Sequence, residues 1–166
     1  MKTPLLLSLL LLFISQPTLH PAEPPPSSPW LTSLPQALTL AKKQRKPLLL
    51  LFTGSDWCSW CRRLQNEVLS TPVFQNFARD HLILVEIDFP RLKPMPLEQH
   101  HANLMLADRF GIIGLPSLLL LNDQGEKLAE FGFPQGGPSS LITKIQTALP
   151  STLPLNPPPP NSPSAQ

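Results

Sequence analysis

The chain alternates between continuous apolar runs and segments in which apolar residues recur every three or four positions. Short continuous runs indicate buried strands, and the recurrent spacing indicates amphipathic helices. The runs predict strands over Leu48–Thr53, Leu82–Asp88 and Ser117–Leu121, and the turn signal Asn122–Gly125 predicts a return strand over Glu126–Gly132. The periodic segments predict helices over Trp30–Arg45, Cys58–Leu69, Pro72–His81, Glu98–Phe110 and Pro138–Leu149.

This order of elements predicts an α/β fold with a central mixed β-sheet flanked by helices on both faces. Strands that are separated by a helix are expected to lie parallel, because a crossover returns the chain to its starting edge. The hairpin at Asn122–Gly125 is expected to add an antiparallel edge strand.

Proline is concentrated at the two ends of the chain, which limits the folded part. Of the 23 prolines, eight lie within Met1–Pro35 and seven within Pro150–Gln166. We therefore expect one folded domain over residues 30–149, a proline-rich linker over 23–29 and a proline-rich disordered tail over 150–166.

Residues 1–22 predict a secretory signal peptide. One positive charge, Lys2, precedes the apolar run Leu5–Ile14, which is short for a membrane span. An uncleaved membrane anchor is the alternative. Both hypotheses place the domain outside the cytosol.

The net charge of +2 is small and its carriers are scattered, so nucleic acid is not an expected partner. The chain has two cysteines, Cys58 and Cys61, at the start of the second predicted helix. No second cysteine pair or suitably spaced histidine pair completes a zinc site, and Arg62 stands where haem attachment needs histidine. No metal or cofactor is expected.

Redox chemistry is the hypothesis that this pair favours over a structural disulfide. A bridge that closes so short a loop constrains the unfolded chain little. A thiol at a helix N-terminus faces unpaired backbone N–H groups and the positive end of the helix dipole, which favour the thiolate. The thiolate is the species that attacks disulfides.

The combination of strand, Trp57–Cys61 motif, helix, strand, helix and a proline before a β-hairpin resembles the thioredoxin family over residues 30–149. Within it, Thr53–Cys61 and the downstream Glu67-Val68 and Ser70-Thr71-Pro72 resemble the chlamydial periplasmic DsbH-type disulfide reductases. The resemblance implies a thioredoxin-like fold and thiol–disulfide oxidoreductase activity without a cofactor.

The resemblance also implies roles for single residues. Cys58 is expected to attack, and Cys61 to resolve the mixed disulfide, so that the two form a redox-active disulfide. Trp57, Ser59 and Trp60 surround them as supporting residues. Pro116 corresponds to the cis-proline of the family, and Leu115 and Pro116 are expected to bind an extended substrate peptide.

Two family features are missing from the expected positions. Phe52 stands six residues before the first cysteine, where the family holds a buried aspartate, and Leu84 replaces a lysine on the next strand. The proton acceptor for Cys61 is therefore not identified. Glu86 and Glu67 are weak substitutes, because both are expected to face solvent.

The expected partners are disulfide-containing extracytoplasmic proteins and a membrane-bound thiol donor, since two cysteines provide no internal relay. A monomer is expected. A reductase is favoured because no charged residue lies between the cysteines to stabilise the thiolate. An oxidant or isomerase on the same fold, and a non-catalytic binding or chaperone module, remain as alternatives.

Overall fold

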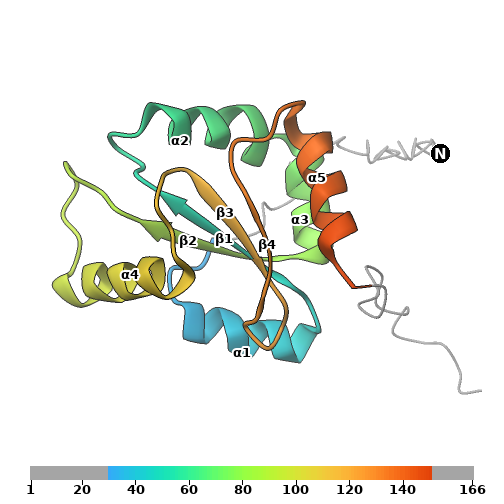
Figure 1. Ribbon diagram of the computed structural model, residues 1–166, viewed down its shortest axis with the longest axis horizontal. Coiled ribbons are helices and arrows are strands. Elements are labelled where there is room, and N and C mark those ends of the chain that lie inside the picture. Colours follow the sequence, from blue (N-terminus) through green and yellow to red (C-terminus); the bar gives the residue numbers. More distant parts are fainter. Residues whose placement is uncertain (1–29, 151–166) are drawn as a thin grey trace, which may run out of the picture.

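The computed structural model describes residues 30–150, which form a four-stranded sheet between two layers of helices (Figure 1). The elements in chain order are α1 (Leu34–Gln44), β1 (Leu48–Thr53), α2 (Ser59–Leu64), the π-helical turn η1 (Gln65–Leu69), α3 (Pro72–His81), β2 (Ile83–Asp88), α4 (Leu97–Phe110), β3 (Ser117–Leu121), β4 (Lys127–Phe131) and α5 (Gly137–Ala148). No helix within this range is long and apolar enough to cross a bilayer. The predictions for residues 1–29 and 151–166 lie outside the described residues.

The strands are arranged in the order β2-β1-β3-β4, with β1 and β2 parallel and both remaining pairs antiparallel. The mixed sheet and the β3–β4 hairpin are confirmed. The expectation that strands separated by a helix lie parallel was wrong for β3, which follows α4 but runs antiparallel to β1. Ser117 pairs with Phe52, so the connection through α4 returns to the edge where β1 and β2 end, and β3 enters from that edge.

Both faces of the sheet are buried, as the continuous apolar runs predicted. Every residue of β1 is buried, and its side chains point alternately to the two faces. Leu49 and Leu51 pack in the layer formed with α2, η1, α3 and α5, whereas Leu48, Leu50 and Phe52 pack in the layer formed with α1 and α4. Figure 1 shows the same division, with α1 and α4 on one side of the strands and α2, α3 and α5 on the other. The prediction of helices on both faces is confirmed.

The first helix begins later than predicted. Leu31 lies outside it and forms a bridge to Val85 of β2, with its backbone bonded to Leu84 and Glu86. The helix begins at Leu34, so that Pro35 falls in its first turn. A helix that began at Trp30 would place this proline in its interior, where its missing N–H would break the hydrogen-bonding pattern.

The helix that carries the cysteines changes its form after one and a half turns. It is α-helical to Leu64 and continues as the π-helical turn η1, in which the N–H of Ser70 donates to the carbonyl of Gln65. Thr71 then caps α3 by accepting from the N–H of Phe74, and Pro72 occupies the first turn, as predicted.

Candidate active site

Cys58 and Cys61 lie where the chain leaves the end of β1 and enters α2. Cys58 is the N-cap of α2, and Cys61 lies in its first turn. The two form a disulfide, with a Cα–Cα distance of 5.2 Å, as the motif predicted. Cys58 is 8% exposed and Cys61 is 3% exposed, so Cys58 is the more accessible of two buried sulfurs.

The environment of Cys58 favours negative charge on its sulfur. Its Sγ accepts a hydrogen bond from the backbone N–H of Cys61 at 3.2 Å. The same N–H remains available to the thiolate once the disulfide is reduced, and the helix dipole adds to its effect. This arrangement lowers the free energy of the reactive, deprotonated form of Cys58.

Trp57 is held tightly beside the cysteines. Its Nε1 donates to the carbonyl of Phe89 at 2.7 Å, and the guanidinium of Arg91 lies 3.7 Å from the centre of its ring. A Cβ atom on Gly54 would lie 2.5 Å from the indole ring, so only glycine allows this packing. The supporting position predicted for Trp57 therefore has a physical basis in three separate contacts.

Two aspartates form hydrogen bonds that connect the turn between β1 and α2 to the end of β2 and to the loop that follows it. Asp88 accepts from the N–H of Ser55 at 2.9 Å and from its hydroxyl at 2.6 Å. Asp56 accepts from the backbone N–H groups of Arg91, Leu92 and Lys93, at 3.0, 2.8 and 2.9 Å. These N–H donors, that of Arg91 foremost, lower the pKa of Asp56 below its usual value of 3.8.

Trp60 and Ser59 lie on the outer side of the motif. Trp60 is 55% exposed, and its ring meets that of Phe133 edge-on with 5.5 Å between centres. The guanidinium of Arg63 lies 5.3 Å from both ring centres. Ser59 is exposed and makes no side-chain hydrogen bond within residues 30–150. The two residues between the cysteines therefore bring no charge of their own to the sulfurs.

The Leu115–Pro116 segment lies at the same edge of the sheet. Its peptide bond is cis, the form that the resemblance implies. The pairing of Ser117 with Phe52 places Pro116 beside the end of β1, from which the cysteine turn departs. Ile113, two residues before Leu115, is fully exposed, and Leu92 in the loop after β2 is 80% exposed.

The residues that lie beneath the cysteines, where the family holds a buried acid, differ from the sequence-based expectation. Phe52 is fully buried in the layer of α1 and α4, so it does not lie beneath α2. Leu51 lies on the α2 face instead, and Glu86 of β2 is its partner in the sheet. Glu67 is half exposed and paired with Arg63, as expected, but Glu86 is only partly accessible, so its predicted exposure was wrong.

Comparison with known proteins agrees with this geometry. A family described as a thioredoxin-like domain matches residues 34–134, more than half of the chain. The chain belongs to the thioredoxin-like family. The predicted family and fold are confirmed.

Its relatives include proteins with thiol–disulfide activity. The disulfide bond reductase DsbH of Chlamydia pneumoniae is 39% identical over 117 residues, 70% of each chain. A solved structure of a DsbH oxidoreductase matches with a TM-score of 0.68 at 36% identity, covering 81% of this chain and 94% of that one. The thioredoxin-related protein DsbJ of Chlamydia pneumoniae is 33% identical, although the chain spans only 37% of its length. With its Cys58–Cys61 disulfide, this thioredoxin-like chain is a thiol–disulfide oxidoreductase.

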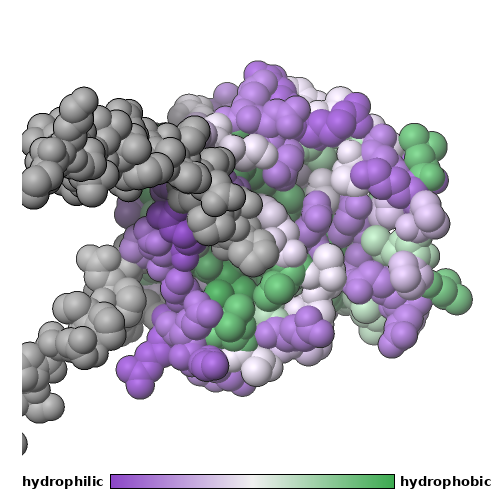
Figure 2. All heavy atoms as spheres, turned by 180° about the vertical axis from the view of Figure 1, so that it is seen from behind, coloured by the Kyte–Doolittle hydropathy of each residue, from purple (hydrophilic) through white to green (hydrophobic). Residues whose placement is uncertain are grey.

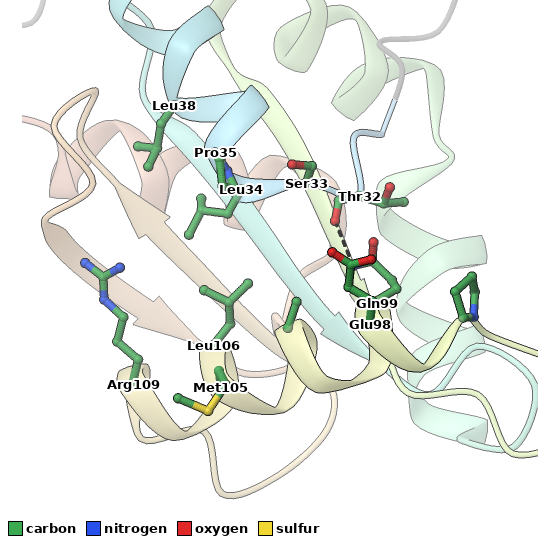
Figure 3. A pocket seen from close by; sticks show the side chains of 12 residues that line it. Thr32, Ser33, Leu34, Pro35, Leu38, Glu98, Gln99, Met105, Leu106 and Arg109 are labelled. Carbon is green, nitrogen blue, oxygen red and sulfur yellow. Dashed lines mark hydrogen bonds between the residues drawn. The ribbon is translucent and has the colours of Figure 1, made fainter.

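A cavity of the described residues lies away from this chemistry. It measures about 850 Å³ and lies between α1 and α4, where Leu34 and Leu38 face Met105 and Leu106 (Figure 3). None of its lining residues belongs to the site around Cys58 and Cys61. Within residues 30–150, no three His, Cys, Asp or Glu side chains are grouped as a metal site would require.

Several site residues of this thioredoxin-like protein were missed from the sequence. Asp56 is not among the predicted site residues, although its carboxylate accepts hydrogen bonds from the backbone of the loop at Arg91–Lys93. Arg91 and Phe133 were not considered, because their partners, Trp57 and Trp60, lie far from them along the chain. The only sequence signal was the position of Asp56 immediately before the motif.

Proposed function

We propose that this oxidoreductase reduces disulfides of extracytoplasmic proteins, with Cys58 as the attacking and Cys61 as the resolving thiol. The observation that supports these roles most directly is the hydrogen bond from the Cys61 N–H to Cys58 Sγ. In this proposal the Cys58 thiolate attacks a substrate disulfide and forms a mixed disulfide with one substrate sulfur. Cys61 then attacks Cys58 Sγ, closes the intramolecular disulfide and releases the substrate thiol.

The uncharged residues between the two cysteines support a reductase rather than an oxidant. A strongly oxidising dithiol needs a reduced form that is unusually stable, which a positive charge near the thiolate provides. Here Ser59 and Trp60 carry no charge, and the guanidinium of Arg63 lies against the Trp60 and Phe133 rings. The name of the matched DsbH protein, a disulfide bond reductase, supports the same direction.

The substrate peptide is proposed to bind along Leu115 and Pro116. These residues border the cysteine turn at the edge of the sheet. Exposed apolar side chains lie on segments that meet at this end of the sheet: Ile113 precedes Leu115, Leu92 follows β2, and Trp60 lies between the cysteines. An unfolded or extended segment around a substrate disulfide offers apolar side chains to such a surface. Trp57, Ser59 and Trp60 are the supporting residues of the motif in this proposal.

The proposed compartment is the periplasm, reached through a signal peptide in residues 1–22, with residues 23–29 as linker and 150–166 as tail. The electron donor is proposed to be a membrane-bound thiol protein, since Cys58 and Cys61 are the only cysteines of the chain. A monomer is proposed because the back of the domain, outside the grey atoms, is mainly hydrophilic with small separate hydrophobic areas (Figure 2).

Trapping of intermediates tests the roles of the two cysteines. Cys61→Ser should accumulate mixed disulfides with extracytoplasmic partners, because nothing within the protein can then release the Cys58–substrate bond. Cys58→Ser should accumulate none. The measurement is non-reducing electrophoresis of periplasmic extracts after the free thiols have been blocked with acid and an alkylating agent.

Equal trapping by the two variants would overturn the assignment of the roles. A non-catalytic binding or chaperone module is tested in parallel by the reduction of insulin with dithiothreitol as the donor. The wild-type protein should accelerate it, and Cys58→Ser should abolish the acceleration. Unchanged activity in Cys58→Ser would show that the disulfide is not the reacting group.

A further inference from the structure

Resolution of the mixed disulfide requires Cys61 to lose its proton. A neutral thiol has an ordinary pKa of about 8.5 and is a poor nucleophile at neutral pH, so a base must accept this proton. Cys61 is 3% exposed, which restricts direct transfer to bulk solvent. On the face of β1 that lies beneath α2, Thr53 is the last residue and carries no basic group, and the position before it on that face is Leu51, which cannot accept a proton.

Glu86 lies next to that position on the neighbouring strand. It is the sheet partner of Leu51 and therefore projects from the same face of the sheet, towards α2. Cys61 and Glu86 line the same small cavity, of about 130 Å³, together with Thr53, Ser55, Arg62, Gln65 and Asn66. A space of this size holds several water molecules, and the polar side chains among its lining residues offer them hydrogen-bond partners.

The carboxylate of Glu86 is free to take a proton. It forms no ion pair or side-chain hydrogen bond within residues 30–150. The charged groups around it are Asp88 on its own strand, Lys93 in the following loop and Arg62 of α2, while β1 and residues 30–33 bring none. Burial raises the pKa of Glu86, the Asp88 carboxylate raises it further, and Lys93 opposes them.

We propose that Glu86 accepts the proton of Cys61, through water in the shared cavity, when the mixed disulfide is resolved. The proposal rests on the roles of Cys58 and Cys61 given above. It deepens them by naming a proton acceptor on β2 in place of an acid on β1.

The step balances as follows. The Cys61 S–H bond breaks, and its proton passes to the Glu86 carboxylate. The electron pair left on Cys61 Sγ forms the bond to Cys58 Sγ, and the bond between Cys58 and the substrate sulfur breaks. The substrate leaves as a thiolate and takes up a proton from solvent or from the Glu86 carboxylic acid. Cys58 and Cys61 are oxidised, and the substrate disulfide is reduced to two thiols.

A single-turnover reaction of the reduced protein with the aromatic disulfide dithiobis(nitrobenzoate) separates the two chemical steps. Cys58 releases the first coloured thiolate, and the attack of Cys61 on the resulting mixed disulfide releases the second. In the wild-type protein, the rate of the second release should be level over the pH range between the pKa values of Glu86 and Cys61. It should fall below that range as Glu86 becomes protonated and can no longer accept.

Glu86→Gln, which conserves the shape of the side chain, should slow the second release about 100-fold at mildly acidic and neutral pH, at the low end of general-base effects. Its rate should rise tenfold per pH unit without a level region, and it should approach wild type at alkaline pH, where Cys61 ionises unaided. Glu67→Gln is the matched control, because Glu67 is exposed, paired with Arg63 and absent from the cavity lining. It should behave as wild type.

The opposite result would come from a carboxylate that only repels the Cys61 thiolate, since Glu86→Gln would then speed the second release. Either a faster Glu86→Gln variant or a wild-type profile that lacks the level region overturns the proposal. The wild-type profile decides even if the variant is unstable. Loss of the first release would instead contradict the proposed role of Cys58, so the two failures are distinguishable.

Discussion

Trp60 occupies the position between the cysteines at which a single charge would change the chemistry most. Its indole packs against Phe133 and brings no charge to the thiolate of Cys58. That thiolate is stabilised by the backbone N–H of Cys61 and by the helix dipole. Because a disulfide's reduction potential rises when the thiolate of the reduced form is stabilised, the neutral Trp60 keeps the potential low.

Trp60→His should therefore raise the reduction potential by tens of millivolts, where 30 mV corresponds to about 1.4 kcal/mol in this two-electron couple. The imidazolium would favour the Cys58 thiolate. The measurement is equilibration of each variant in glutathione buffers at mildly acidic pH, where histidine is charged. Trp60→Gln is the control, since it removes the same ring without adding charge. A shift that is equal in both variants would assign the effect to lost packing.

Among the single residues of the site, the sequence predicted those that belong to a contiguous motif. Cys58, Cys61 and Trp57 lie together in five consecutive positions, and Pro116 directly precedes a recognisable strand. The position of Glu86 beneath α2 was not predicted, because the face of the sheet to which a strand residue points depends on the register of that strand. A one-residue difference decides whether Phe52 or Leu51 lies beneath the cysteines, and the packing of Leu51 with α2 resolves it. The pairing of Leu51 with Glu86 then places Glu86 on the same face.

Among the elements, the loop between β2 and α4 has the most direct influence on the site. The carbonyl of Phe89 in this loop accepts a hydrogen bond from the indole N–H of Trp57. Three backbone N–H groups of the loop donate hydrogen bonds to the carboxylate of Asp56. Its Arg91 covers the Trp57 ring. The loop and the cysteine turn therefore stabilise each other, and the prolines noted in the sequence account for its irregular path without indicating these contacts.

Asp56→Asn should loosen this loop at neutral pH. An asparagine keeps one acceptor oxygen and replaces the other with an NH₂ group, which cannot accept from the backbone. Amide hydrogen exchange at Arg91, Leu92 and Lys93 should speed up, while exchange in β1 stays unchanged. Asp80→Asn is the control, because Asp80 is exposed and pairs only with the adjacent Arg79.

Acidification should have the same local effect on the wild-type protein. Since the pKa of Asp56 is lowered in the folded state, the stabilisation by its carboxylate is present above the usual aspartate value of 3.8 and is lost as the pH falls through the lowered value. Protection of the three amides that is insensitive both to this pH change and to Asp56→Asn would show that the hydrogen bonds contribute little.

The existence of the elements was more predictable than their direction or exact start. Apolar runs and helical periodicity located all four strands and the helices, since burial dictates these patterns. The direction of β3 depends on where the connection through α4 returns to the sheet, which local patterns do not encode. The late start of α1 depended on a tertiary pairing, that of Leu31 with Val85.

In the whole molecule, the residues of the candidate active site lie together at one edge of a sheet that is packed on both faces. β1 and β2 end, and β3 begins, at the edge that carries the cysteine turn, the Asp88 anchor and Pro116. Both faces of β1 are packed, so the turn departs from the most buried strand of the sheet. We expect a dithiol held in this way to change its redox state with little rearrangement of the core.

The reduction potential of the wild-type protein depends on the relative stabilities of its reduced and oxidised forms. The helix N-terminus and the Cys61 N–H stabilise the reduced form to a moderate degree. No charged residue lies between the cysteines, and Glu86, which lines a cavity with Cys61, would oppose negative charge on Cys61. We expect a potential nearer to that of thioredoxin, about −270 mV, than to that of the strong oxidant DsbA, about −120 mV. Equilibration with dithiothreitol and glutathione buffers, followed by the fluorescence of Trp57 and Trp60 beside the sulfurs, measures it directly. A value above about −180 mV, the region of protein disulfide isomerase, would contradict the reductase proposal and favour an oxidant or isomerase instead.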